Sequence, residues 1–336
     1  MTRLGRTLLL LPFVAPAFAA GPAFAKHARP KHKSHHASRN ASGEERERPV
    51  STYLHDGRPN ILAESAIVID LATGKELFER HGDDVRPIAS ISKLMAMMVV
   101  LDHNLNLDLT TEVLPSDRDL ARRGARSRLP TGRTFTNKDL LHAALMASDN
   151  RAVPALGRAV GLDPAALTAE MNKKARALGL VHTAFGDPTG LDDRNRSTSR
   201  ELAKMLAAAL KYPLITEITQ KSQYLARAVD QPGYTVEYQN TDVIARGGKY
   251  QVLAGKTGYT DLAGYCLAIA AKIADGDGVH DVAMVFLGEH QKLTRFGDFS
   301  RTAQWVTEKG PIDRTVATQP LPAAPAPPKT ASSSPL

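Results

Sequence analysis

The chain has 336 residues, a formal net charge of +8 at pH 7 and a single cysteine. One cysteine excludes an intramolecular disulfide framework. The positive charge does not indicate nucleic-acid binding, because no basic motif with interleaved aromatic residues accompanies it.

The first 25 residues are typical of a secretory signal peptide. Arg3 and Arg6 precede an apolar stretch from Leu8 to Ala20, and Ala23-Phe24-Ala25 is a small-x-small cleavage site, with an alternative a few residues earlier. The apolar stretch is interrupted by prolines and is shorter than the roughly 20 residues that a membrane-spanning helix needs. We therefore expect cleavage of residues 1–25 and export to the periplasm.

Two further segments have compositions that predict disorder. Residues 26–60 are basic and histidine-rich with few apolar side chains, so we expect a solvated tether that can contact an anionic wall or membrane surface. Metal binding by the histidines at 27–36 is disfavoured, because no carboxylate or cysteine completes a ligand set there. Residues 311–336 are rich in proline, alanine and serine, which predicts an extended tail. The folded domain is expected over residues 61–310.

The elements expected within this domain begin and end with strands. Apolar alternation predicts a hairpin with strands at 66–70 and 76–79. The apolar spacing that follows predicts a helix beginning near Ser90, and residues 102–135 are polar and irregular. Spacing and capping residues predict helices at 137–147, 150–160, 164–178 and 199–211. The last expected elements are strands at 250–257, 263–273 and 280–287 and a helix at 293–308.

The order of these elements predicts an α+β fold. Strands from the two ends must meet in one mostly antiparallel sheet flanked by helices, because hairpin-like links join the late strands. The block between them, at about residues 102–212, becomes a helical lobe. A cleft between sheet and lobe is where functional groups from distant segments can converge, and residues 102–135 and 228–250 are expected to border it.

The stretch Ser90-Ile91-Ser92-Lys93 places a serine and a lysine about one helical turn apart. A serine hydroxyl becomes an effective nucleophile only when a base takes its proton, and a lysine held neutral by burial can be that base. We therefore interpret Ser90 as a nucleophile near the positive end of a helix dipole, and Lys93 as its base.

Two further motifs follow in order along the chain. Ser148-Asp149-Asn150 comes after a predicted helix, and Lys256-Thr257-Gly258 comes after a strand-like run. The ordered set Ser-x-x-Lys, Ser-Asp-Asn and Lys-Thr-Gly is the signature of class A β-lactamases and penicillin-binding proteins. Taken singly, the motifs can be a solvated lysine, a helix cap and a bend, but the three in order favour one catalytic site.

The remaining polar residues of the motifs have expected roles. Ser148 can relay a proton to the leaving amine, and Asn150 can grip a substrate peptide group or orient Lys93. Lys256 can help to keep Lys93 neutral and can attract a carboxylate. Thr257 can donate a hydrogen bond to that carboxylate.

Gly258 is expected to leave room for substrate to lie along the strand as an added edge. The backbone N–H groups of Ser90 and Tyr259 are the expected oxyanion donors. Cys266 has small apolar neighbours, so a buried strand residue is favoured over a free nucleophile. No zinc motif is present in the sequence, and a P-loop is excluded because Tyr250 occupies the required glycine position; we expect no metal or other cofactor.

Several stretches carry a family resemblance, namely 86–95, 144–152, 185–191, 195–198, 255–260 and 263–267. They resemble the serine D-Ala-D-Ala peptidases, the low-molecular-mass penicillin-binding proteins, and in particular the D-alanyl-D-alanine endopeptidase type (penicillin-binding protein 7-like). The resemblance implies a β-lactamase/transpeptidase-like fold. It also implies cleavage of D-alanyl bonds in peptidoglycan stem peptides through an acyl-enzyme, and covalent inhibition by β-lactams.

The choice between related activities depends on the segment after Trp305. Carboxypeptidases of this superfamily often carry a further β-rich domain and an amphipathic helix, whereas a proline-rich tail follows here. We therefore expect a D,D-endopeptidase that cuts cross-links, with a D-alanyl-D-alanine carboxypeptidase as the alternative. A β-lactamase is less favoured, since no Glu-x-x-x-Asn lies between the second and third motifs. A non-catalytic wall-binding protein is disfavoured by the intact Ser90 and Lys93.

Overall fold

The computed structural model describes residues 51–120 and 127–309. The predicted signal peptide, the predicted tether up to residue 50 and the predicted tail lie outside the described residues. Within the described part, no helix has both the length and the apolar character that a membrane crossing requires.

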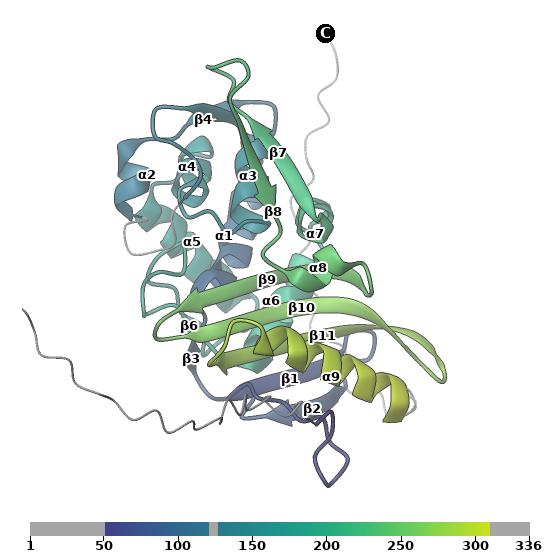
Figure 1. The fold of residues 1–336 in the computed structure, drawn as a ribbon. Helices are drawn as coiled ribbons and strands as arrows, with labels where there is room; N and C mark the ends of the chain where they lie inside the picture. The colour runs from purple at the N-terminus through teal and green to yellow at the C-terminus, as the bar shows by residue number, and fades with distance from the viewer. Residues whose placement is uncertain (1–50, 121–126, 310–336) are drawn as a thin grey trace, which may run out of the picture. The chain divides into compact units, whose positions relative to one another are not determined.

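A five-stranded antiparallel sheet with the order β2-β1-β11-β10-β9 lies at the centre of the domain (Figure 1). Strand β1 pairs with β11 along its whole length, from Ser65 opposite Leu287 to Asp70 opposite Val282. The prediction that both ends of the domain meet in one antiparallel sheet is therefore confirmed. The strands of this sheet are β1 (Ser65–Asp70), β2 (Glu76–Arg80), β9 (Gln251–Thr260), β10 (Gly264–Asp275) and β11 (Gly278–Glu289).

The predicted helices are present, and two of them begin at residues whose side chains cap the helix. Asp163 accepts a hydrogen bond from the Ala166 N–H at 2.7 Å and begins α5, and Thr136 accepts one from the Asp139 N–H at 3.1 Å and begins α3. Such side-chain caps satisfy N–H groups that a helix leaves unpaired. The longer helices are α1 (Ser92–Asp102), α3 (Asn137–Leu145), α4 (Ala152–Ala159), α5 (Pro164–Ala177), α6 (Ser199–Ala209) and α9 (Thr294–Lys309).

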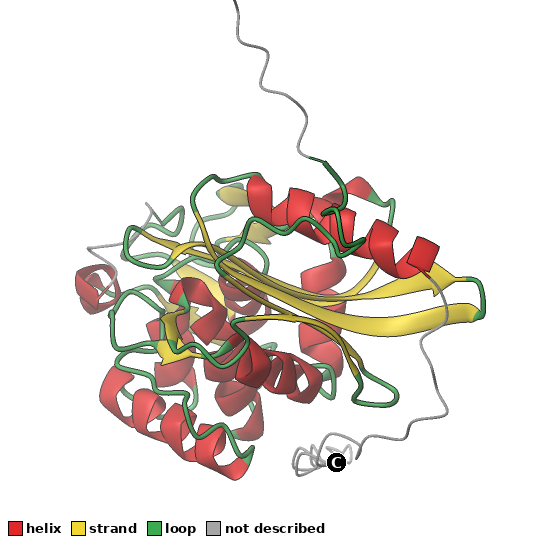
Figure 2. Ribbon diagram, turned by 90° about the horizontal axis from the view of Figure 1, so that it is seen from below, coloured by secondary structure: helices red, strands yellow, loops and turns green. Residues whose placement is uncertain are grey.

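Two hydrophobic cores lie on opposite faces of the sheet. Along β11, Val282, Met284 and Phe286 belong to the core under α9, whereas Ala283 and Val285 belong to the core shared with the other helices. This alternation is what a strand buried on both faces requires, because successive side chains point to opposite sides. Figure 2 shows α9 above the sheet and the helical block below it, and the short segment around Val243 and Ile244 packs against the same core as α9. Helix α6, inside the predicted 102–212 lobe, packs directly on β11 and β1.

The structure also contains short elements that the sequence analysis left unplaced. The expectation of irregular chain over residues 102–135 was wrong, because β4 and β5 pair there with Thr111 opposite Phe135. Residues 228–250 include β8, which forms a hairpin with β7. The short elements are β3 (Arg86–Pro87), β4 (Thr110–Glu112), α2 (Pro115–Leu120), β5 (Thr134–Thr136), β6 (Arg196–Ser197), α7 (Pro213–Gln220), β7 (Gln223–Arg227), β8 (Thr235–Gln239) and α8 (Val243–Gly247).

The segment just before β1 is bound by a carboxylate of α9. Asp298 of α9 is fully buried and accepts hydrogen bonds from the N–H groups of Leu62, at 2.8 and 3.0 Å, and of Ala63, at 2.8 Å. Arg301 pairs with the same carboxylate. Residues 51–60, assigned to the tether from the sequence, form a turn in which Tyr53 bridges Pro59. The Asp298 side chain thus links the segment before β1 to α9, in addition to the pairing of β1 with β11.

We expect Asp298→Ala to lower the free energy of unfolding by about 3 kcal/mol, because it leaves the N–H groups of Leu62 and Ala63 without an acceptor and removes the partner of the Arg301 guanidinium. Urea unfolding followed by circular dichroism measures this. The exposed Asp277 of the β10–β11 turn provides the matched control, and Asp277→Ala should change stability by less than about 0.5 kcal/mol. Equal losses in the two variants would show that Asp298 does not stabilise the link between these segments.

Candidate active site

Ser90 lies in a 3₁₀ turn, Ala89–Ile91, that leads directly into α1. The turn is held between two glycines from distant segments. A Cβ at Gly190 would lie 2.1 Å from the Ala89 carbonyl oxygen, and one at Gly258 would lie 2.9 Å from that of Ile88. Gly258 was expected to leave room for substrate. In the structure, its lack of a side chain makes room for the turn that carries Ser90.

Lys93 is completely buried, and its Nζ contacts three groups from separate segments. It lies 2.7 Å from Ser90 Oγ, 2.7 Å from Asn150 Oδ1 and 2.7 Å from the Thr189 carbonyl oxygen. As an ammonium group it donates all three hydrogen bonds, and as a neutral amine it can accept the Ser90 proton. The predicted pairing of Ser90 with Lys93 is present in the geometry.

Burial sets the protonation state of this lysine. Loss of hydration lowers the pKa of Lys93 to about 7, although the nearby carboxylates of Asp187 and Asp149 oppose the change. An ordinary lysine amine stays protonated until pH 10 or so. Near neutral pH, a substantial fraction of Lys93 is therefore neutral and able to take a proton.

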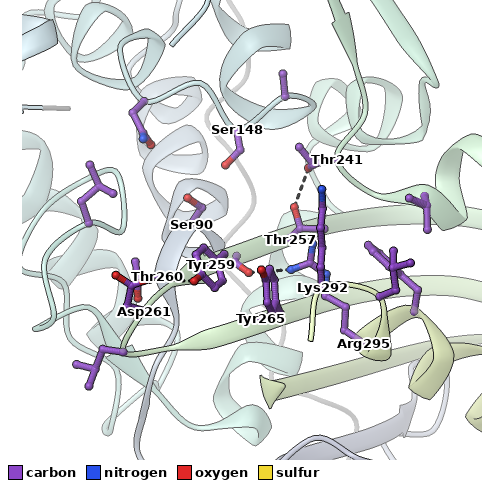
Figure 3. A pocket seen from close by; sticks show the side chains of 18 of the residues that line it. Ser90, Ser148, Thr241, Thr257, Tyr259, Thr260, Asp261, Tyr265, Lys292 and Arg295 are labelled. Carbon is purple, nitrogen blue, oxygen red and sulfur yellow. Dashed lines mark hydrogen bonds between the residues drawn. The ribbon is translucent and has the colours of Figure 1, made fainter. Parts of the chain in front are cut away.

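The second motif connects the helical lobe to the same lysine. Ser148 has a left-handed backbone, with φ 60°, and its side chain lines the cleft (Figure 3). Asp149 points away and binds Ser127 Oγ at 2.6 Å. Helix α4 has no side-chain N-cap hydrogen bond, so neither Ser148 nor Asn150 caps it.

The third motif lies on β9, the edge strand of the sheet. Lys256 is buried and donates to the Thr257 carbonyl at 2.9 Å. Burial, together with the positive charges of Lys93 and Arg295, holds the pKa of Lys256 well below its usual range. The charge of Lys93 thus contributes to the low pKa of Lys256, whereas the low pKa of Lys93 comes from burial; the expectation that Lys256 keeps Lys93 neutral stays a prediction. Thr257 Oγ1 lies 2.7 Å from Thr241 Oγ1.

Tyr259, the last predicted binding residue, stands on the rim. Its side chain is about half exposed and stacks on Tyr265 with ring centroids 4.2 Å apart. Its hydroxyl donates to Asp261 at 2.9 Å. The aromatic pair forms one wall of the cleft beside the free edge of β9 (Figure 3).

These groups surround a cleft of about 980 Å³. Such a volume suits a substrate larger than a single amino acid. The polar and charged side chains that line it are those of Ser90, Ser148, Asn150, Asp193, Thr241, Arg246, Thr257, Tyr259, Thr260, Asp261, Tyr265, Lys292 and Arg295.

The structure adds residues that sequence reasoning missed. Arg295 of α9 is buried and donates from Nη1 to the carbonyls of Gly258, at 3.0 Å, and Cys266, at 3.4 Å. The Asp187 carboxylate accepts from the N–H groups of Thr189, at 3.1 Å, and Gly190, at 2.9 Å, and so holds the carbonyl that contacts Lys93. The loop that contains Asp187 lies in the stretch 185–191, so the family resemblance could have indicated it. No local sequence pattern indicates a role for Arg295.

Cys266 is confirmed as a buried strand residue. Burial raises the pKa of its thiol to about 11, so a reactive thiolate is disfavoured. Across residues 51–120 and 127–309, no three side chains of the His, Cys, Asp and Glu types come together as a metal site.

Comparison with known proteins gives a consistent result. The sequence model of the family described as D-alanyl-D-alanine carboxypeptidase (peptidase S11) matches residues 53–290. The D-alanyl-D-alanine endopeptidase of Escherichia coli K12 is 38% identical over 267 residues, covering 80% of this chain and 82% of the relative. That of Pseudomonas aeruginosa is 38% identical over 244 residues, covering 72% and 76%. The crystal structure of the Streptomyces K15 DD-transpeptidase superposes with a TM-score of 0.66 at 26% identity, covering 74% of this chain and 98% of that one.

We expect acylation of Ser90 by a fluorescent penicillin to depend on pH through Lys93. The neutral amine is the active form, so the rate should rise through a pKa of about 7 and level off above it. Below pH 6, each further unit should cost about tenfold. Stopped labelling reactions between pH 5 and 9 measure the profile, and Ser90→Ala supplies the blank. A rate independent of pH over this range would exclude Lys93 as the base.

Gly190→Ala should reduce the same labelling by roughly 100-fold, because the added Cβ displaces the turn that carries Ser90. Gly161→Ala is the matched control: φ is +77° at Gly161 and +88° at Gly190, but no atom lies within 4 Å of a Cβ at 161. The control should lose some stability yet keep its labelling rate. Similar labelling by both variants would mean that Gly190 does not position the nucleophile.

Proposed function

Since the chain belongs to the D-alanyl-D-alanine carboxypeptidase family of serine peptidases, we propose that it is an exported D,D-endopeptidase that cuts peptidoglycan cross-links. It is a serine D-Ala-D-Ala peptidase that acts on peptidoglycan peptides. The observation that carries the catalytic assignment is the 2.7 Å contact between the buried Lys93 Nζ and the Oγ of Ser90, which lines the cleft. The endopeptidase assignment is supported by relatives of that name that align over most of their length.

The proposed reaction begins with a neutral Lys93. Its Nζ takes the hydroxyl proton as Ser90 Oγ bonds to the D-alanyl carbonyl carbon, and the carbonyl oxygen becomes negative. The N–H groups of Ser90 and Tyr259 stabilise that oxygen. The proton then passes through Ser148 to the leaving nitrogen as the C–N bond breaks. Water adds to the acyl-enzyme, and Ser90 regains its proton.

The direction of substrate in the cleft follows from charge. The carboxylate next to the scissile bond can accept hydrogen bonds from the hydroxyls of Thr257 and Thr241, which lie 2.7 Å apart in the cleft that Arg295 also lines. The leaving group therefore occupies this end, and the acyl group occupies the end near Tyr259. Asn150, bound to Lys93 at 2.7 Å, acts as an orienting group.

A carboxypeptidase is the second candidate, because removal of a terminal D-alanine needs the same bond chemistry. It is favoured by the description of the family, and by the Bacillus subtilis D-alanyl-D-alanine carboxypeptidase DacF, which is 31% identical over 229 residues and is covered over 57% of its length. The extent of the cleft beyond Thr257 favours the endopeptidase, since a single amino acid leaves that space empty.

The setting of the reaction is also part of the proposal. The signal-like residues 1–25 support export to the periplasm, and the basic segment that follows supports contact with an anionic wall or membrane surface. The acyl-enzyme chemistry supports covalent inhibition by β-lactams, which present a strained amide to the same serine.

Digestion of two purified muropeptides, a cross-linked dimer and a monomeric pentapeptide, tests the proposal by mass spectrometry. We expect the dimer to be split into monomers by the wild-type protein and left intact by Ser90→Ala. Prior incubation with benzylpenicillin should abolish the cleavage. Loss of one alanine from the pentapeptide, with the dimer untouched, would instead establish a carboxypeptidase.

A further inference from the structure

The cleft has an uneven distribution of charge along its length. Asp261 lies on one side of Ser90, and Lys292 and Arg295 lie on the other (Figure 3). Arg246 of α8 also lines the cleft. A peptide bound across Ser90 therefore meets positive charge at its leaving end, beyond the threonines that receive the carboxylate next to the scissile bond.

Lys292 differs from the other cations of this end. Arg295 donates to backbone carbonyls of the cleft wall, whereas Lys292 is exposed and points into the cleft that Thr241 and Thr257 also line (Figure 3). Within residues 51–120 and 127–309, Lys292 has no hydrogen bond or ion pair. An exposed ammonium with no internal partner, directed into a binding cleft, is available to an anionic group of a ligand.

Arg246 adds a second charge of the same kind. It is exposed, and its Nη1 donates to the neutral Gln239 Oε1 at 3.3 Å. In the described part of the chain, no carboxylate forms an ion pair with Arg246 or Lys292. The two side chains together make an anion-attracting rim beyond Thr257.

The two candidate reactions place different groups against this rim. In a carboxypeptidase reaction the leaving group is one D-alanine, whose single carboxylate is held at Thr257. In an endopeptidase reaction the leaving group is a whole second stem peptide, which has a free carboxyl terminus of its own. Only this longer leaving group brings a further carboxylate beyond Thr257.

We propose that Lys292, assisted by Arg246, binds a carboxylate of the second stem peptide and so selects cross-linked substrates. This subsite rests on the proposed endopeptidase function. Its contribution is electrostatic and solvent-exposed, so it weakens as salt is added. Lys292 makes no contact with Ser90 or Lys93 and leaves the acylation chemistry to them.

The first test compares kcat/KM for the cross-linked dimer and the monomeric pentapeptide. Lys292→Ala should lower the ratio of dimer to pentapeptide cleavage about fivefold, and Lys292→Arg should retain it. Lys249→Ala is the matched control, because Lys249 is an exposed lysine that lies over Tyr250 and does not line the cleft. An unchanged ratio in Lys292→Ala, or an equal loss on both substrates, would overturn the assignment.

The second test separates this inference from the proposed function. Titration calorimetry measures binding of the intact dimer to Ser90→Ala and to the Ser90→Ala/Lys292→Ala double variant, without turnover. Weaker and less salt-sensitive binding by the double variant supports the subsite, even where the wild-type protein fails to cut dimers and the endopeptidase proposal falls. Equal affinity, or no dimer binding by either variant, overturns the subsite.

Discussion

The active centre depends on a lysine amine removed from water. Lys93 Nζ has a position fixed by three contacts of 2.7 Å, to the serine turn, to Asn150 of the helical block and to the loop at Thr189. Burial alone disfavours the charged form, and the surrounding carboxylates restore part of its stability. The balance leaves an amine that can both gain and lose a proton near neutrality, which a general base requires.

Close packing of the backbone fixes the position of Ser90 relative to the Lys93 amine. Ala89 and Ser148 both have positive φ, at 47° and 60°, although neither is glycine. Such conformations persist only when the surroundings enforce them. Gly190 and Gly258 supply the close approach on either side of the serine turn, and the Asp187 carboxylate ties the first of these loops together. Contacts from segments distant in the sequence stabilise these unfavourable backbone conformations.

The sheet contributes its free edge. β9 is the last strand in the order, and its residues 257–260 line the cleft, so this part of its outer edge can receive an extended peptide as an added strand. The meeting of β1 with β11 brings α9 across the opposite face of the sheet, and its first turn carries Arg295 under the third motif. A helix that buries one core thus also supplies the charge at the leaving end of the cleft.

Local sequence determined the long elements and the reacting groups. The caps Thr136 and Asp163, the spacing of α1 and the apolar late strands act over a few residues, so their effects could be predicted without the fold. The three ordered motifs likewise identified Ser90, Lys93 and their partners as one site. Short strands such as β4 and β8 have too few residues for apolar periodicity to predict them. Pairing with a partner strand stabilises them.

Only the tertiary structure decided how those groups meet and what surrounds them. The contact of Lys93 with Thr189, the position of Arg295 beneath β9 and the packing role of Gly258 all join segments tens of residues apart. Local periodicity cannot predict such contacts, because they arise only when both ends of the domain meet in one sheet with a core on each face. The sequence determined which chemistry is present, and the fold determined the burial, charge and space that allow it to work.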